Sequence, residues 1–166
     1  MPRKLLPIAL AAATLVACAS QPRAPAPVTA PVVSMPAPTE ELDWLFAVDG
    51  SEGVLSYGTP HSDDLRLGLR CRKGAPTLNL ILIAGEEDPH AITLQAGGVT
   101  RAFPARAEEE PMTGGLLLTA RVRKDDPVIQ AFRRDGWIAL VGPGGADGYA
   151  PQAGTTAVEA FFQWCA

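Results

Sequence analysis

Hydrophobic and polar residues alternate strictly over residues 65–72. Side chains of a β-strand point alternately to the two faces of its sheet. The segment therefore predicts a strand with two different faces. Its apolar face carries Leu65, Leu67, Leu69 and Cys71. Its opposite face carries Arg66, Gly68, Arg70 and Arg72. We expect the apolar face to lie against the core.

Other short apolar runs, separated by turn residues, predict further strands. These runs cover residues 44–48, 54–57, 77–84, 91–95, 99–103, 116–122 and 137–141. Both alternating faces of residues 77–84 are largely apolar, so we expect that strand to be covered on both sides. Gly97 and Gly98 tolerate the positive φ of a tight turn and predict a hairpin there. Loops are expected at residues 104–115 and 142–148.

Two helices are predicted late in the chain. Asp126 and Pro127 are typical of a helix start, and Gly136 is typical of a helix end. In the last segment, Thr156 and Glu159 have the spacing of a capping box. The apolar residues of that segment recur at helical spacing, which places them on one face: Val158, Phe161, Phe162 and Cys165.

The predicted strands do not alternate with full-length helices, which argues against a parallel sheet built from βαβ units. We therefore predict a mainly β (α+β) fold. The expected architecture is an antiparallel β-sandwich or a partly open barrel, with a short helix and a C-terminal helix packed on it. Residues 41–166 are expected to form this single domain.

The amino-terminal residues have the features of an export signal. A basic start at residues 1–4 is followed by an apolar run at 5–16, which is shorter than the roughly 18–20 residues that span a membrane. The run ends in Leu15-Val16-Ala17-Cys18. This pattern resembles the lipobox of bacterial lipoproteins. The resemblance covers residues 1–18 only, and an ordinary secretory signal peptide is the alternative.

The lipobox resemblance implies removal of residues 1–17 and lipidation of Cys18, with diacylglycerol on its sulfur and an acyl chain such as palmitate on its amino group. Several acyl chains anchor a protein stably to a membrane. Ala19 resembles the residue found in lipoproteins sorted to the outer membrane, where the domain would face the periplasm. Six prolines within residues 19–40 predict an extended tether between Cys18 and the domain.

Charge narrows the range of partners. The full chain carries 14 basic and 18 acidic residues. Removal of residues 1–17 takes away Arg3 and Lys4, which leaves 12 basic residues against 18 acidic ones and a net charge of −6. A net-acidic protein repels phosphate backbones, so we expect no nucleic-acid partner.

Cys71 and Cys165 both lie on faces predicted to be buried, one on a strand and one on the last helix. Export would deliver the chain to an oxidising compartment, where disulfides persist. We therefore predict a disulfide between them. Two separate buried thiols are the alternative.

His61, Asp63 and Asp64 form the densest polar cluster of the sequence. Imidazole and carboxylate groups are suitable metal ligands or acid–base groups. The alternative is a turn in which Ser62 or Asp63 bonds its own backbone and leads into the strand. No motif identifies catalytic residues, a metal site or a cofactor; the glycine-rich residues 142–148 lack the lysine of a phosphate-binding loop.

Arg66, Arg70 and Arg72, next to Lys73, form a basic stripe on the polar face of the central strand. This stripe is the candidate binding surface for anionic sugars, phosphates or an acidic partner. The alternative is a solvent-exposed face that is kept soluble and protected against edge pairing.

The run Tyr57-Gly58-Thr59-Pro60-x-Ser62-Asp63-Asp64, together with Phe161-Phe162-x-x-Cys165, resembles small exported proteins of alphaproteobacteria. That resemblance implies no activity and no site residues. The sequence as a whole favours a non-enzymatic binding or scaffold module of the cell envelope, with an envelope protein or the cell wall as partner. The alternatives are a small periplasmic hydrolase or metal-dependent enzyme built on the His61 loop, and a carrier of small ligands.

Overall fold

The structure, a computed structural model, describes residues 34–62, 64–84, 90–110, 114–142 and 145–166. The predicted signal peptide, Cys18 and the tether up to residue 33 lie outside these residues. Asp63 also lies outside them.

The described chain contains nine strands and two helices. The strands are β1 (Asp43–Asp49), β2 (Glu52–Gly58), β3 (Leu65–Arg72), β4 (Thr77–Ala84), β5 (Ala91–Ala96), β6 (Val99–Glu109), β7 (Leu116–Arg123), β8 (Ile138–Gly142) and β9 (Gly145–Tyr149). The helices are α1 (Pro127–Asp135) and α2 (Thr156–Trp164).

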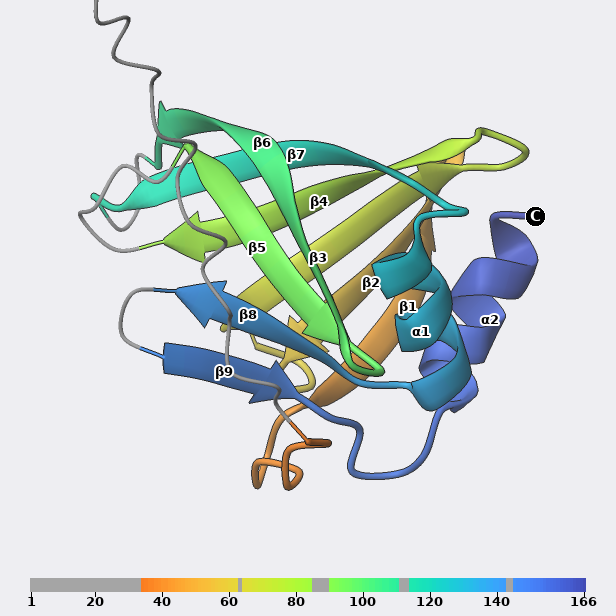
Figure 1. Ribbon diagram of the computed structural model, residues 1–166. Coiled ribbons are helices and arrows are strands. Elements are labelled where there is room, and N and C mark those ends of the chain that lie inside the picture. Colours follow the sequence, from red (N-terminus) through yellow and green to blue (C-terminus); the bar gives the residue numbers. More distant parts are fainter. Residues whose placement is uncertain (1–33, 63, 85–89, 111–113, 143–144) are drawn as a thin grey trace, which may run out of the picture.

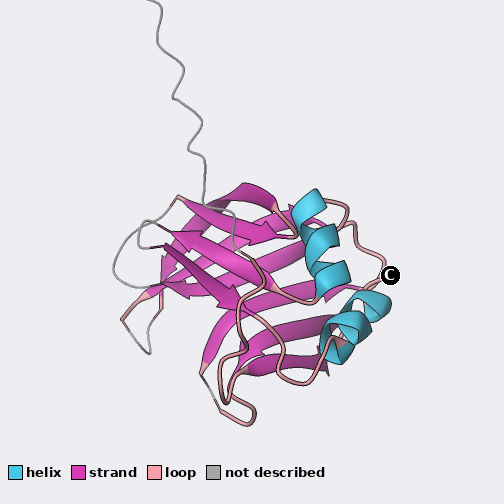
Figure 2. Cartoon of the chain, turned by 60° about the horizontal axis from the view of Figure 1, so that its bottom comes forward, coloured by secondary structure: helices cyan, strands magenta, loops and turns pink. Residues whose placement is uncertain are grey.

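All nine strands belong to one antiparallel sheet in the order β1-β2-β3-β4-β7-β6-β5-β8-β9. The sheet curls into a half-barrel, and both helices lie at the same end of it (Figures 1 and 2). The prediction of a mainly β fold is confirmed. Of the two expected architectures, the partly open barrel describes the structure, since the sheet curls on itself.

The central strand β3 has the predicted bounds and the predicted two faces. Leu67, Leu69 and Cys71 are buried, as the alternation requires. Leu65 departs from the pattern and is 41 % exposed. A register shift between Tyr57 and Gly58 of β2 places Leu65 opposite Gly58, which moves its side chain away from the core.

Aromatic rings fill the inside of the curled sheet and connect it to both helices. Consecutive rings have centroids 4.9–6.2 Å apart in mainly tilted or edge-on arrangements, which aromatic pairs favour. The series runs through Tyr149, Tyr57, Trp44, Phe132, Phe162, Phe161 and Phe46.

The predicted disulfide is confirmed. Cys71 of β3 and Cys165, directly after α2, are bonded, with their Cα atoms 5.9 Å apart and a sequence separation of 94. Around the bond, Lys124 Nζ donates to the Cys165 carbonyl over 2.6 Å, and the Gly74 amide donates to the same oxygen. The end of α2 is therefore fixed to the end of β3 by one covalent bond and one hydrogen bond, and to the residue after β7 by a second hydrogen bond.

The helix starts were predicted with different success. Asp126 caps α1 through a 3.0 Å bond from the Val128 amide, and Gly136 ends that helix at a φ of 74°. At α2 the predicted pairing of Thr156 with Glu159 is wrong by one residue. Thr155 is the N-cap, and its hydroxyl donates to the Glu159 carboxylate.

Two predicted loops are strands instead. Residues 104–109 continue β6, which pairs with β5 up to Pro104 and with β7 from Ala105 onward. Proline, which has no amide proton, therefore sits where the strand changes partner. At residues 142–148, Gly145–Tyr149 forms β9, a hairpin partner of β8. Its glycines left no apolar alternation from which a strand could be predicted.

The expectation that β4 is covered on both faces is also wrong. Leu78, Leu80 and Leu82 are buried, but the opposite face is open, with Ile83 42 % exposed.

Among the described residues, neither helix has the length and hydrophobicity needed to cross a membrane.

The end of the predicted tether packs against the domain. Pro36 lies directly over Gly148 of β9, where any side chain would collide with it. Further along, the side-chain amide of Gln152 donates to the Thr39 carbonyl. The backbone amide of Gln152 donates to the Asp43 carboxylate over 3.1 Å. Residues 36–40, predicted as part of the tether, therefore lie against the domain.

Replacing both Cys71 and Cys165 by alanine is expected to lower the free energy of unfolding by about 3–5 kcal/mol, because the unfolded chain then regains the freedom of a long loop. Urea denaturation of the oxidised protein and of the double variant measures the difference. The wild-type protein treated with a reductant should match the variant. Equal midpoints for oxidised protein and variant would contradict the expectation.

Candidate binding surface

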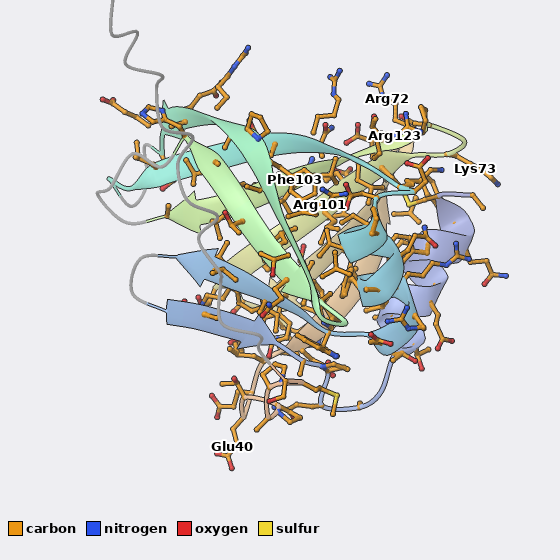
Figure 3. The ribbon with its side chains drawn as sticks, viewed as in Figure 1. Glu40, Arg72, Lys73, Arg101, Phe103 and Arg123 are labelled. Carbon is orange, nitrogen blue, oxygen red and sulfur yellow. A yellow bond between two sulfur atoms is a disulfide. The ribbon has the colours of Figure 1, made fainter. Side chains whose placement is uncertain are left out.

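Six arginines gather on the outer, convex side of the curled sheet, over three strands. We call this surface the arginine face. It comprises Arg66, Arg70 and Arg72 of β3, Arg106 of β6, and Arg121 and Arg123 of β7. Arg72 and Arg123 lie at the same end of the sheet as Lys73 (Figure 3). Strand β3 is paired on both sides, so protection of a free edge does not explain its arginines.

Strand pairing brings arginines of β3 and β7 to either side of β4. Arg70 is opposite Asn79, and Asn79 is opposite Arg121. One step along the strands, Thr77 is opposite Arg123. Neighbouring strands lie roughly 4.8 Å apart, and residues on one face repeat about every 6.7 Å along a strand. Arginine side chains therefore flank an amide and a hydroxyl in two successive rows.

Four of the six arginines are paired with carboxylates. Glu52 is shared by Arg70 at 3.8 Å and Arg72 at 3.4 Å. Arg66 pairs with Asp64 at 3.0 Å, and Arg123 pairs with Asp125 at 2.6 Å. The hydrogen bond from Arg123 lowers the pKa of the Asp125 carboxyl and raises the pKa of the guanidinium. These exposed pairs contribute little stability, but they reduce the positive charge available to a ligand.

Arg106 and Arg121 differ from the other four. Both are exposed, and within the described parts of the chain neither has an ion pair or a hydrogen bond to a carboxylate. Arg106 is opposite Thr119, two residues from Arg121 on the same face of β7. Such diagonal neighbours lie about 7–8 Å apart, within reach of two long side chains. Their positive charge is available to an external anion.

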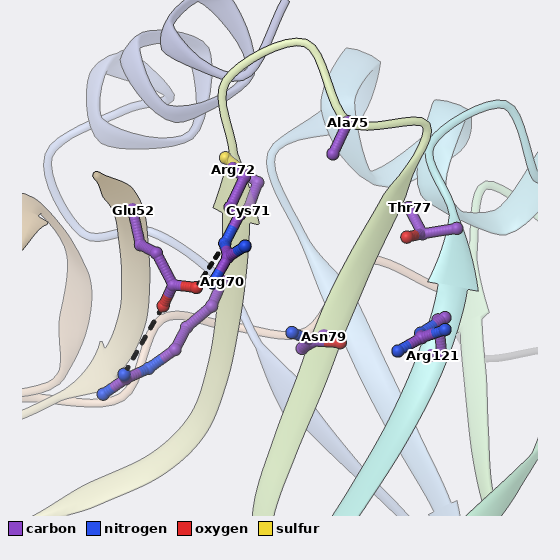
Figure 4. A pocket seen from close by; sticks show the side chains of 8 residues that line it. All are labelled: Glu52, Arg70, Cys71, Arg72, Ala75, Thr77, Asn79 and Arg121. Atoms are coloured by element: carbon purple, nitrogen blue, oxygen red, sulfur yellow. Dashed lines mark hydrogen bonds and ion pairs between the residues drawn. The ribbon is translucent and has the colours of Figure 1, made fainter.

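An open hollow of about 310 Å³ lies at the end of the arginine face. Its polar lining comes from four strands: Glu52, Arg70, Arg72, Thr77, Asn79 and Arg121. Figure 4 shows Arg70 and Arg72 joined to Glu52 on one side, with Asn79 and Arg121 on the other side free of such contacts. The hollow thus has one half occupied by a carboxylate of the protein and one half without any.

A second hollow, a shallow apolar groove of about 140 Å³, continues from the first along β3 and β4. Both hollows share Arg70. The apolar lining of the groove is Val54, Leu65, Leu67, Gly68, Ile81, Ile83 and Leu117. Gly68 forms its floor because it has no side chain. The arginine face therefore combines an anion-binding end with an apolar trough.

The predicted polar cluster forms a turn at the chain entry to β3. The Ser62 hydroxyl donates to the Thr59 carbonyl and accepts from the Asp64 amide, each over 3.1 Å. His61 is exposed, with a φ of 63°. Asp64 accepts two hydrogen bonds from Arg66. No three metal-ligating side chains come together anywhere in the described residues, and Asp63 lies outside them.

Arg66 has different neighbours from the other arginines of the arginine face. It hydrogen-bonds Asp64, which raises the pKa of its guanidinium, and it lies within electrostatic range of Tyr149 and Asp147 of β9. Burial, reinforced by the negative charge of Asp147, raises the pKa of Tyr149 to about 12. The predicted stripe is therefore divided: Arg70 and Arg72 line the hollow, and Arg66 borders the groove.

Sequence reasoning missed Glu52, Asn79, Arg106 and Arg121. The alternation in residues 116–123 does place Thr119 and Arg121 on one polar face. What the sequence could not supply was the position of β7 beside β4, since the two strands are far apart in the chain.

No known protein family, curated protein or solved structure matches this chain.

The tyrosine at position 149 gives a test in alkaline solution. An unfolded tyrosine ionises near pH 10, but folded Tyr149 holds its proton to about pH 12. The contribution of protonated Tyr149 to the free energy of unfolding is therefore fully present below pH 10. It is lost as the pH rises from 10 toward 12, by up to about 1.4 kcal/mol per pH unit. The Tyr149→Phe variant should lose less stability over this range in urea denaturation. Equal slopes for the two proteins would contradict the prediction.

Proposed function

We propose that this chain is a membrane-anchored lipoprotein of the cell envelope, and that its β-rich domain is a non-enzymatic binding or scaffold module. The arginine face is the surface that meets an acidic partner, either an envelope protein or the cell wall. The observation that carries this proposal is the presence of Arg106 and Arg121 on one open face, exposed and without carboxylate partners in the described chain.

The location follows from the sequence. The run Leu15-Val16-Ala17-Cys18 resembles a lipobox, and the lipid would hold the protein on the outer membrane, facing the periplasm. The tether keeps the domain at a distance from the lipid surface. A disulfide that closes a long loop suits an oxidising compartment. Anchor, tether and oxidised domain are consistent with display of a binding surface.

The alternative, a periplasmic hydrolase or metal-dependent enzyme built on the His61 loop, has no observation in its favour among the residues that the structure describes. The carboxylate of Asp64 is held by Arg66, and the Ser62 hydroxyl is engaged with the backbone of its own turn. A nucleophile or general base needs a free, converging partner. The arginine face offers charge and hydrogen bonds instead, which serve recognition.

Lipidation at Cys18 can be tested directly in cells. A clickable palmitate analogue is expected to label the full-length protein and to place it in the membrane fraction. The Cys18→Ala variant should lose the label and leave that fraction. Ser20→Ala changes a residue close to Cys18 and leaves every cysteine in place; it is the matched control, which should keep the label. Labelling that survives in Cys18→Ala would contradict the anchor.

The binding surface can be tested by photo-crosslinking in cells that express the full-length protein. A photoreactive residue at Thr119, in the middle of the arginine face, is expected to form a discrete adduct with an envelope component. The same residue at Gln163, exposed on α2, should not form that adduct.

Charge reversal then shows whether the arginines are responsible. Arg70→Glu with Arg121→Glu should reduce the adduct at position 119 by about tenfold or more, because the surface would repel an acidic partner. Arg101→Glu is the control; Arg101 is exposed and lies beside Asp126 at the start of α1. An adduct that persists in the double variant, or that forms equally well at position 163, would contradict the proposal.

A further inference from the structure

We propose that the arginine face recognises an extended acidic segment of a partner protein. Its carboxylates would lie at Arg121 and Asn79, and its apolar side chains would lie in the groove floored by Gly68. This inference rests on the proposed binding function and specifies the chemistry of the partner.

The hollow is built to hold carboxylates. One side chain of the protein, Glu52, already lies in it and is shared by Arg70 and Arg72. The Glu52 side chain is 27 % exposed, so this carboxylate is partly withdrawn from water and is still compensated by two guanidinium groups. The arrangement around Glu52 is an example, within the protein, of the contact a ligand carboxylate would make.

The other half of the hollow also has hydrogen-bond donors, but no carboxylate of the protein lies among them. Asn79 is directly opposite Arg121, and Thr77 is the next outward residue along β4. Arg121 supplies a forked set of donors, and the Asn79 amide and the Thr77 hydroxyl supply more. Arg106 adds a second unpaired charge next to Thr119. Arg106 lies beside the hollow and is not part of its lining. A carboxylate that enters here meets the Arg121 guanidinium and loses no existing ion pair of the protein.

The apolar groove begins where the charged hollow ends. Along the outer face of β4, the residues change from Thr77 and Asn79 to Ile81 and Ile83. Ile83 is 42 % exposed and Leu65 is 41 % exposed, and both line the same groove. Exposed apolar side chains that gather in one groove are typical of a docking surface. A ligand that fits both hollows is therefore acidic at one end and apolar at the other.

The spacing favours an extended polypeptide. Outward residues of β4 repeat about every 6.7 Å, and alternate side chains of an extended peptide repeat at the same distance. A peptide lying along β4 would thus place acidic side chains over the first two rows and apolar side chains over the next two. A simple phosphate ion would use the arginines and leave the groove empty.

Two synthetic peptides of equal composition and charge test this pattern. Both are acetylated and amidated, so that neither has terminal charges. In Glu-Ser-Glu-Ser-Leu-Ser-Leu, all four key side chains fall on one side of an extended chain. In Glu-Glu-Ser-Leu-Leu-Ser-Ser they fall on both sides. The first peptide is expected to bind the purified full-length protein, with its disulfide intact, at least about fivefold more tightly than the second at low salt in calorimetry.

Two variants separate the halves of the site. Arg121→Ala should lower the affinity for the first peptide by about five- to tenfold, and Arg101→Ala should leave this affinity unchanged. Gly68→Val should lower the affinity for the first peptide by a similar factor, because the valine side chain would fill the groove. An added Cβ at Gly68 would have only ordinary contacts, the nearest being Ile81 Cβ at 3.7 Å, and valine suits a strand. Gly142→Val, at another strand glycine with open space, is the matched control.

Each outcome bears on a definite claim. Equal affinity for the two peptides, or binding that Gly68→Val does not weaken, would overturn the extended-peptide inference. So would inorganic polyphosphate that binds with the affinity of the first peptide and is unaffected by Gly68→Val. If the crosslink at position 119 still depends on the arginines in any of these cases, the proposed function stands and only this inference fails.

Discussion

The bond between Cys71 and Cys165 is the constraint on which the rest of the structure depends. Cys71 is the last buried residue of β3, and Cys165 follows the last turn of α2, so the bond holds the helix against the end of the sheet. Gly53 of β2 lies next to this bond and against the Trp164 ring, where a side chain would collide with the ring and crowd the Cys71 sulfur. Covalent attachment at this point keeps β2, β3 and α2 in fixed positions, and these strands also carry the binding surface.

Local patterns were sufficient to predict much of this fold. The alternation of residues 65–72 gave the bounds and both faces of β3, and the apolar spacing near the C-terminus gave the buried face of α2. The disulfide followed from these two patterns together. Predictions failed where local chemistry misleads. Pro104 suggested a loop but lies in a strand that changes partner, and the glycines of β9 carry no alternation.

The site was predicted only in part, because it depends on pairings between distant strands. Arg70 and Arg72 could be placed on one face of β3 from their spacing alone. Arg121 joins them only because β7 pairs with β4, nearly forty residues further along the chain, an arrangement that no local pattern specifies. The open outer face of β4 is a consequence of the same topology: both helices lie at one end of the half-barrel and leave that face to solvent.

Exposed arginines alone would make a weak site. Ion pairs in water contribute at most about 1 kcal/mol each, and salt screens them, so their main effects are on the rate of encounter and on the choice of partner. Affinity has to come from buried apolar contact. The groove around Gly68 can supply this contact at no cost in folding, since Ile83 is exposed and Ile81 is only half-buried already. The combination also gives selectivity: a purely anionic ligand gains nothing from the groove, and a purely apolar one gains nothing from Arg121. Only a ligand with both features uses the whole arginine face.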